Sequence, residues 1–289
     1  MRRLLWAAVA VAWLATAPLS AHADAAQRAA WNRPFTPFKV VGNVYYVGPA
    51  GVSAWLITTP KGHVLIDGAL EESASQIEQH VEALGFHMRD VKILLSSHAH
   101  YDHAGGLADL KRASGARMTA SAGDKPILEA GKISFGPSKS DPFPPVKVDR
   151  VVRDGDTVAL GGSVLTAHLT PGHTPGCTTW TLPIVEAGRR LTVVFYCSTS
   201  VAGNPLTGDP ASPRIVANYQ QTFARLKGLK ADVFLGPHVE FFDLNGKRAR
   251  MKAGGPNPFV DPGELQRFVK DSEADFQAEL AKARQAPSH

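Results

Sequence analysis

Residues 97–106 read Ser97-His98-Ala99-His100-Tyr101-Asp102-His103-Ala104-Gly105-Gly106, a segment with three histidines and one aspartate within six positions. The apolar run before it, Val91 to Ser96, has the length and β-branched content of a buried strand. The residues after it, Leu107 to Arg112, are typical of the first turns of a helix. Four potential metal ligands therefore lie in a turn between a strand and a helix, where irregular backbone can direct several side chains to one point.

The spacing of these side chains suits a metal site. His98 and His100 are two residues apart, which in extended backbone puts both imidazoles on the same side of the chain. Asp102 and His103 follow where the chain turns, so they can aim at a neighbouring point. Asp102 alone is equally well explained as a helix N-cap, but a buried cluster of ionisable groups needs metal or charged partners. Nitrogen and carboxylate ligands without thiolate suit zinc in a hydrolytic site.

Two later turns each present one further histidine. Residues 170–176 read TPGHTPG, and the prolines and glycines fix the backbone around His173. His238 follows the apolar strand expected at residues 231–235 and a Gly-Pro break. Each histidine alone is typical of an ordinary loop, but both follow a strand directly, as the first cluster does. Five histidines and one aspartate suffice for two metals: we predict a first zinc at His98, His100 and His173, and a second at Asp102, His103 and His238.

The remaining sequence alternates strands and helices in two halves. Strands are expected at residues 40–41, 44–47, 54–58, 63–67, 91–96, 118–120, 177–183, 191–196 and 231–235 and within 151–170, and helices at 71–84, 104–113, 122–130, 215–226 and 263–284. Residues 131–145 are rich in Gly, Ser and Pro and predict a long loop. Two mixed sheets, each covered by helices on its outer face, would form a four-layer αββα sandwich of the α/β or α+β class in one domain, residues 24–289.

Residues 1–23 have the pattern of a signal peptide. Arg2 and Arg3 form a basic start, Leu4 to Leu19 is apolar, and Ala21-His22-Ala23 is a small-x-small cleavage site. We expect cleavage after Ala23, which lowers the formal charge from +5 to +3, too little and too scattered to indicate nucleic-acid binding. A membrane anchor is the alternative, which the short apolar region disfavours, and no later segment has the roughly 20 apolar residues of a spanning helix. We expect a mature protein in the periplasm or outside the cell.

These motifs resemble the metallo-β-lactamase superfamily over nearly all of the chain from Trp31 onward, and most of all its subclass B3. Many relatives carry an aspartate that bridges both metals, whereas this chain has Ser198 at that position and no carboxylate in residues 195–200. Other lactamase subclasses use a cysteine ligand there and lack a histidine at the position of His103. The nearest thiol here, Cys197, is one residue away, and a one-residue step in a strand points a side chain to the opposite face.

The resemblance implies an exported hydrolase that binds two Zn²⁺ and opens the lactam ring of penicillins, cephalosporins and carbapenems. A hydroxide bridging the two zinc ions would attack the lactam carbonyl, and Asp102 would orient the hydroxide. We expect a monomer whose partner is this small-molecule substrate. The resemblance also implies a set of supporting residues: Ser198 and Ser200 for the substrate carboxylate, Trp31 and Phe135 as walls of the groove, and Asp67 as the buried group that orients the ligand turn.

Two other functions stay open. One is a periplasmic lactone, ester or amide hydrolase of the same fold, which the missing bridging aspartate disfavours. The other is a non-catalytic zinc-binding protein, which the six ligands disfavour because structural zinc sites are usually closed and rich in thiolates. The pairing of Cys177 with Cys197 is also open: they flank an expected hairpin near Ala187 in an oxidising compartment, but hairpin geometry often disfavours a disulfide.

Overall fold

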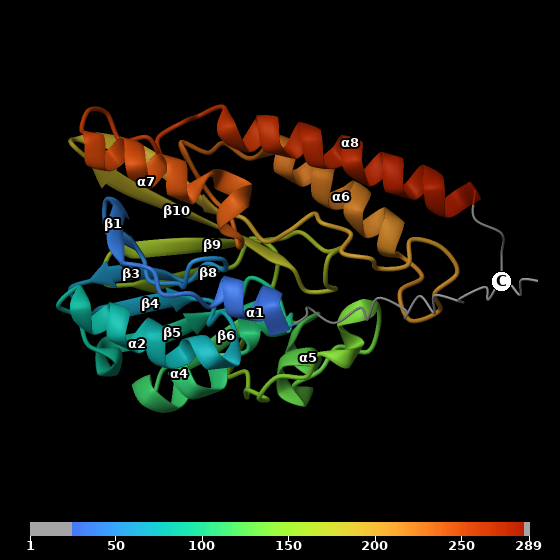
Figure 1. Ribbon diagram of the computed structural model, residues 1–289, viewed down its shortest axis with the longest axis horizontal. Coiled ribbons are helices and arrows are strands. Elements are labelled where there is room, and N and C mark those ends of the chain that lie inside the picture. The colour runs from blue at the N-terminus through green and yellow to red at the C-terminus, as the bar shows by residue number, and fades with distance from the viewer. Residues whose placement is uncertain (1–24, 286–289) are drawn as a thin grey trace, which may run out of the picture.

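Two mixed sheets face each other in the computed structural model, which describes residues 25–285 (Figure 1). The first sheet has seven strands in chain order, antiparallel from β1 to β4 and parallel from β4 to β7. These strands are β1 (Phe38–Val41), β2 (Val44–Tyr46), β3 (Trp55–Thr59), β4 (Gly62–Ile66), β5 (Val91–Leu95), β6 (Arg117–Ser121) and β7 (Arg150–Val152).

The second sheet has five strands in the order β12-β11-β10-β9-β8. Neighbours from β8 to β11 are antiparallel, and β11 pairs with β12 in parallel. The strands are β8 (Thr157–Leu160), β9 (Ser163–Leu169), β10 (Thr178–Glu186), β11 (Arg189–Phe195) and β12 (Val233–Leu235). The two expected hairpins, across residues 161–162 and around residue 187, are both present.

Helices cover the outer face of each sheet (Figure 1), which confirms the predicted four-layer sandwich. The first sheet is covered by α2 (Ala74–Ala83), α4 (Leu107–Ser114) and α5 (Lys125–Ala130), and the second by α6 (Ile215–Gly228), α7 (Leu244–Ala253) and α8 (Glu264–Gln285). The remaining helices are α1 (Ala25–Trp31), α3 (Tyr101–Ala104), η1 (Glu71–Ser73), η2 (Met88–Asp90), η3 (Pro137–Ser140) and η4 (Val239–Phe242). Within residues 25–285 no helix has the length and apolar character to cross a membrane. The predicted signal peptide lies outside the described residues.

Helix α7 has no counterpart among the expected helices because its sequence lacks a clear apolar stripe. Only Leu244 and Lys247 of this helix are buried. Asp243 caps its first turn by accepting a hydrogen bond from the backbone N–H of Gly246. The Lys247 ammonium donates to the Glu264 carboxylate, so this charge pair attaches the helix together with the single fully buried apolar residue Leu244. Charge patterns of this kind do not register in a search for apolar periodicity.

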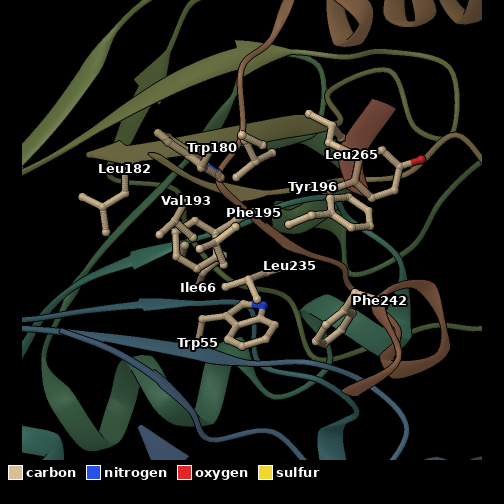
Figure 2. Close-up of a cluster of buried hydrophobic side chains, with 14 of the residues drawn as sticks. Trp55, Ile66, Trp180, Leu182, Val193, Phe195, Tyr196, Leu235, Phe242 and Leu265 are labelled. Carbon is tan, nitrogen blue, oxygen red and sulfur yellow. The ribbon is translucent and has the colours of Figure 1, made fainter. Parts of the chain in front are cut away.

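The larger core cluster lies between the two sheets (Figure 2). Trp55 and Ile66 of the first sheet point toward side chains of β10 and β11, among them Trp180 and Phe195. Trp180 is fully buried, and its indole Nε1 donates to the carbonyl oxygen of Ser96 at 3.2 Å. The core between the sheets is therefore bonded directly to the segment that leads out of β5 toward His98.

Replacing Trp180 by alanine tests this role of the core. Trp180→Ala should lower the free energy of unfolding by about 3–5 kcal/mol, because a fully buried indole leaves a large cavity. The control is Val185→Ala on the same strand, where 62% exposure of the side chain predicts a change within about 0.5 kcal/mol. Urea unfolding of both variants measures the difference, and equal small effects would contradict the core assignment.

Candidate metal centre

The potential ligands come from the carboxyl ends of three strands. The chain leaves β5 at Leu95 and carries the first histidines into α3. It leaves β9 at Leu169 into the turn that holds His173, and it leaves β12 at Leu235 just before His238. Because the two sheets face each other, these three turns meet at one edge of the sandwich. Each ligand is therefore attached to a buried strand.

His98, His100 and His173 form the first cluster, with one potential ligand atom from each within 4.8 Å of the others. His100 Nδ1 lies 2.9 Å from His173 Nε2, and the rings of His98 and His173 are 4.7 Å apart between centroids. His173 Nδ1 donates to the carbonyl oxygen of Ser200 at 2.7 Å. That bond leaves the lone pair on His173 Nε2, the nitrogen that faces the cluster.

The second cluster consists of Asp102, His103 and His238, whose potential ligand atoms also lie within 4.8 Å of one another. The Nε2 atoms of His103 and His238 are 3.2 Å apart. Asp102 Oδ2 lies 3.3 Å from His103 Nε2 and 3.4 Å from His238 Nε2. The structure thus confirms two three-residue clusters of potential metal-ligating side chains. The two clusters adjoin, because the ring centroids of His98 and His103 are only 4.2 Å apart.

The protonation states of these groups suit a metal. Burial lowers the pKa of His98 and His173 well below the usual value, with neighbouring histidines adding to the effect, and lowers the pKa of His100 to about 4. Burial opposes ionisation of Asp102, but the charges and hydrogen bonds of His103 and His238 outweigh it and hold the pKa of this carboxyl well below its usual range. The first cluster therefore presents neutral imidazoles and Asp102 a carboxylate, which are the forms that bind a divalent cation. Burial lowers the pKa of His103, but the Asp102 carboxylate outweighs burial and raises it, so a cation that binds His103 displaces a proton from that ring.

Ring nitrogens without hydrogen-bond partners provide a further test of whether these residues suit a metal ion. Among residues 25–285, four buried histidine nitrogens have no hydrogen-bond partner: His98 Nε2, His100 Nε2, His103 Nδ1 and His238 Nδ1. A buried polar atom without a partner is costly, and native structures contain few of them. Ser97 Oγ lies 3.0 Å from His98 Nδ1, so the unpartnered His98 Nε2 is the ring nitrogen left for a metal. The other three are opposite the ring nitrogens that already meet within the clusters. A set of nitrogen ligands with one carboxylate fits zinc.

A cavity of about 350 Å³ opens over both clusters. Trp31, Ser198 and Ser200 line it, as the resemblance implies, and the Trp31 ring lies 5.3 Å from that of His238 between centroids. Further lining residues were missed from sequence: Gln27, Tyr101, Ser138, Glu240 and Phe241. Tyr101 lies between two predicted ligands, and Glu240 and Phe241 lie within three residues of His238, so these three could have been found on that ground. Gln27 belongs to the unexpected helix α1.

Phe135 does not line this cavity, so its expected place in the groove wall is wrong. Its side chain is 7% exposed and belongs to the core beneath the first sheet, together with Ile133 and Phe143. It borders a separate cavity beside Gly172 and Pro175. The physical reason is that the segment 131–145 anchors its apolar side chains inward, and only Ser138 of this segment is among the cavity-lining residues.

Asp67 lies where the resemblance places it, beneath the ligand turn. Its Oδ1 accepts a hydrogen bond from the backbone N–H of Ser97 at 2.7 Å. The next residue, Gly68, donates its backbone N–H to the carbonyl oxygen of His103 at 2.8 Å. The turn after β4 therefore holds the ligand turn after β5 at both of its ends.

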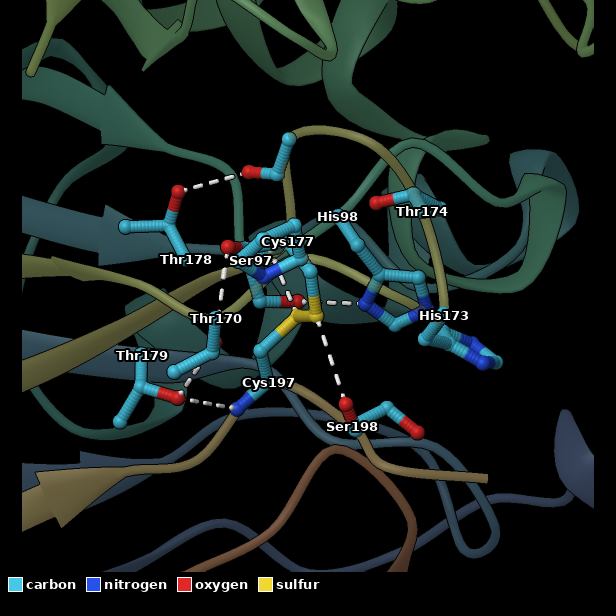
Figure 3. Close-up of a disulfide and its surroundings, with 12 residues drawn as sticks. Ser97, His98, Thr170, His173, Thr174, Cys177, Thr178, Thr179, Cys197 and Ser198 are labelled. Carbon is cyan, nitrogen blue, oxygen red and sulfur yellow. Dashed lines mark hydrogen bonds between the residues drawn. A yellow bond between two sulfur atoms is a disulfide. The ribbon is translucent and has the colours of Figure 1, made fainter. Parts of the chain in front are cut away.

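Cys177 and Cys197 form a disulfide directly beside the first cluster (Figure 3). Their Cα atoms are 5.9 Å apart, and Cys197 Sγ lies 3.2 Å from the carbonyl oxygen of Ser97. The ladder between β10 and β11 ends at the pair of Trp180 and Phe195, so both cysteines lie beyond the paired part of the hairpin. The spacing of paired hairpin residues, which often disfavours a disulfide, therefore does not apply to them. The pairing that the sequence left open is thereby decided, and Cys197 holds no metal.

Comparison with known proteins agrees with this geometry. The family model of the metallo-β-lactamase superfamily matches residues 47–238, a span that contains all six clustered side chains. The chain belongs to the metallo-β-lactamase superfamily. It is 44% identical to BJP-1, a subclass B3 metallo-β-lactamase of Bradyrhizobium japonicum, over 88% of this chain and 97% of that one, with a TM-score of 0.84.

Two further relatives show the range of the family. MEM-A1, a subclass B3 metallo-β-lactamase isolated from a soil metagenome library, is 38% identical over 87% of this chain and 98% of its own, with a TM-score of 0.82. A hydroxyacylglutathione hydrolase of Hyphomonas neptunium is 38% identical over 100 residues, 35% of this chain. That match spans only 32% of the relative's length.

Reduction of the disulfide should weaken the fold measurably. The two cysteines are separated by 20 residues, so the loss of this crosslink should lower the free energy of unfolding by about 3 kcal/mol. Guanidinium unfolding with and without a thiol reductant measures the change, and a Cys177→Ala/Cys197→Ala double variant that no longer responds to reductant is the control. Identical curves for the oxidised and reduced parent protein would contradict a stabilising role.

Proposed function

We propose that this protein is an exported, zinc-dependent β-lactam hydrolase that acts on penicillins, cephalosporins and carbapenems. The observation that carries the proposal is the pair of adjoining ligand clusters beneath a cavity of about 350 Å³. Identity of 44% to a subclass B3 metallo-β-lactamase over most of both chains supports the choice of substrate class. The predicted signal peptide and the disulfide support export, since disulfides persist in oxidising compartments.

The chain would hold one Zn²⁺ with His98, His100 and His173 and another with Asp102, His103 and His238. Bound zinc supplies a Lewis acid and makes water a nucleophile near neutral pH. Asp102 faces both rings of its cluster through one carboxylate oxygen and orients the attacking water. His173 is held in the required tautomer by Ser200.

Two serines supply hydrogen-bond donors for the substrate. The backbone N–H of Ser200 donates to Ser198 Oγ at 3.1 Å, which leaves the Ser198 hydroxyl proton available to a ligand. Among the described residues that line the cavity, none is a lysine or an arginine. We therefore assign the substrate carboxylate to the hydroxyls of Ser198 and Ser200, and the apolar wall of the groove to Trp31.

The alternative activity is hydrolysis of a lactone, an ester or another amide. The partial match to a hydroxyacylglutathione hydrolase is the observation in its favour. Against it stands Ser198, which replaces the carboxylate that many such relatives place between the two metals. Both activities share the zinc centre, so only substrate turnover separates them.

Hydrolysis of a chromogenic cephalosporin and of a carbapenem by the mature protein tests the proposed function. Turnover should disappear after treatment with a chelator, return with added zinc, and persist in the presence of an inhibitor of serine lactamases. Absence of turnover by zinc-loaded protein would contradict the lactam assignment. A panel of lactones and esters would then identify the alternative.

Replacing a ligand tests the two-metal assignment. His238→Ala should leave one zinc per chain and lower turnover by more than the roughly 10- to 100-fold that the loss of an outer-shell partner costs. The matched control is His87→Ala, at an exposed histidine outside both clusters, which should retain two zinc ions and full turnover. Zinc content and initial rates are measured on the same samples. Full activity of His238→Ala with a single zinc would contradict a functional second site.

A further inference from the structure

The carboxylate of Asp124 lies just before α5 and bonds to two separate segments of the chain. It is 1% exposed. Its Oδ2 accepts hydrogen bonds from the backbone N–H of Ala99 at 2.9 Å and from Thr174 Oγ1 at 2.8 Å. Its Oδ1 accepts from the backbone N–H of Gly176 at 2.7 Å. One buried side chain thus holds three donors.

These donors are adjacent to all three members of the first cluster. Ala99 lies between His98 and His100, and Thr174 follows His173 directly. The two turns come from different sheets, since one follows β5 and the other follows β9. Asp124 therefore connects the pair of histidines from the first sheet to the single histidine from the second.

The backbone around Asp124 lies in direct contact with the His173 turn. A Cβ atom at Gly123 would lie 2.6 Å from the carbonyl oxygen of Pro175, and one at Gly176 would lie 2.2 Å from the backbone nitrogen of Asp124. Only glycine fits at either position. Ser121 Oγ also donates to the carbonyl oxygen of Gly176, at 2.6 Å. The two segments are thereby held at one separation with little freedom to slide.

A different carboxylate, that of Asp67, holds the start of the turn that carries His98. Asp67 accepts from the backbone of Ser97 and adjoins the residue that bonds His103, so it holds the turn from the side of β4. Asp124 has no bond to Asp102, His103 or His238. Burial raises the pKa of Asp124 to about 6 against the effect of its hydrogen bonds, so at pH 7 both oxygens still act as acceptors.

We propose that Asp124 is the positioning residue of the three-histidine cluster: it sets the distance between the His98–His100 turn and the His173 turn and so the zinc affinity of that cluster alone. The proposal rests on the two-zinc centre but not on the identity of the substrate. Ligand atoms bind a cation tightly only when they are held close to one arrangement, and the His100 and His173 nitrogens are only 2.9 Å apart.

The test is the zinc affinity of Asp124→Asn. An asparagine presents an NH₂ group in place of one oxygen, and that group would face an N–H or O–H donor. We expect the variant to bind zinc about 10- to 100-fold more weakly at the first cluster, with the second cluster unchanged. Competition with a chromogenic chelator gives both affinities. The absorption spectrum of the cobalt-substituted protein reports which cluster has changed, a signature that loss of stability alone would not move.

The matched control is Asp149→Asn. Asp149 also accepts a backbone N–H, that of Met118 at the start of β6, at 2.9 Å, and it bonds Lys111. It is distant in the chain from every ligand and belongs to neither cluster. This variant removes the same kind of bond, a backbone N–H held by a carboxylate, away from both clusters. It should lower stability and leave both zinc affinities and the cobalt spectrum as in the parent.

Thr174→Val is a milder second variant in case Asp124→Asn does not fold. It removes one hydroxyl donor and keeps both backbone bonds, so the first cluster should bind zinc about tenfold more weakly. If Asp124→Asn binds zinc at both clusters as tightly as the parent protein does, the positioning role is overturned. If Asp124→Asn does not fold, the same result for Thr174→Val overturns it. Equal losses at both clusters would overturn its selectivity. A parent protein that binds no zinc would instead contradict the metal centre itself and, with it, the proposed function.

Discussion

Two pairs of histidine nitrogens, 2.9 and 3.2 Å apart, form the constraint on which the rest of the structure depends. Buried polar atoms without partners are costly, and among the described residues His98 Nε2, on a ring beside these pairs, has none. Such an arrangement is stable only if a cation binds it or if a rigid frame holds it open. The frame is built from strand ends, and strand ends are the least mobile places from which a turn can start.

Three kinds of bond transmit the rigidity of the sheets to the ligands. Trp180 joins the core between the sheets to the end of β5. Asp67 and Asp124 hold the ligand turns through backbone N–H groups, one from each side. The disulfide of Cys177 and Cys197 attaches the His173 turn to the segment that carries Ser198 (Figure 3). The proposed metal and substrate sites thus share one support, because these bonds act on neighbouring turns.

The sequence was informative wherever a strand leads directly into a ligand. Apolar runs followed by His98, His173 and His238 predicted both clusters and the two covered sheets, because the alternation of strands and helices is set by local apolar pattern. Contacts between distant segments were not predictable in this way. The inward anchoring of Phe135 and the bonds of Asp124 depend on which turns meet in space, and the attachment of α7 by Lys247 depends on charge pairing without apolar periodicity.

We infer that six side chains hold two zinc ions at the edge of this sandwich. Anomalous diffraction at the zinc absorption edge, from crystals of the purified mature protein, tests it most directly. We expect two peaks per chain, one among His98, His100 and His173 and the other among Asp102, His103 and His238. A single peak shared by both clusters, or no peak in zinc-loaded crystals, would contradict it.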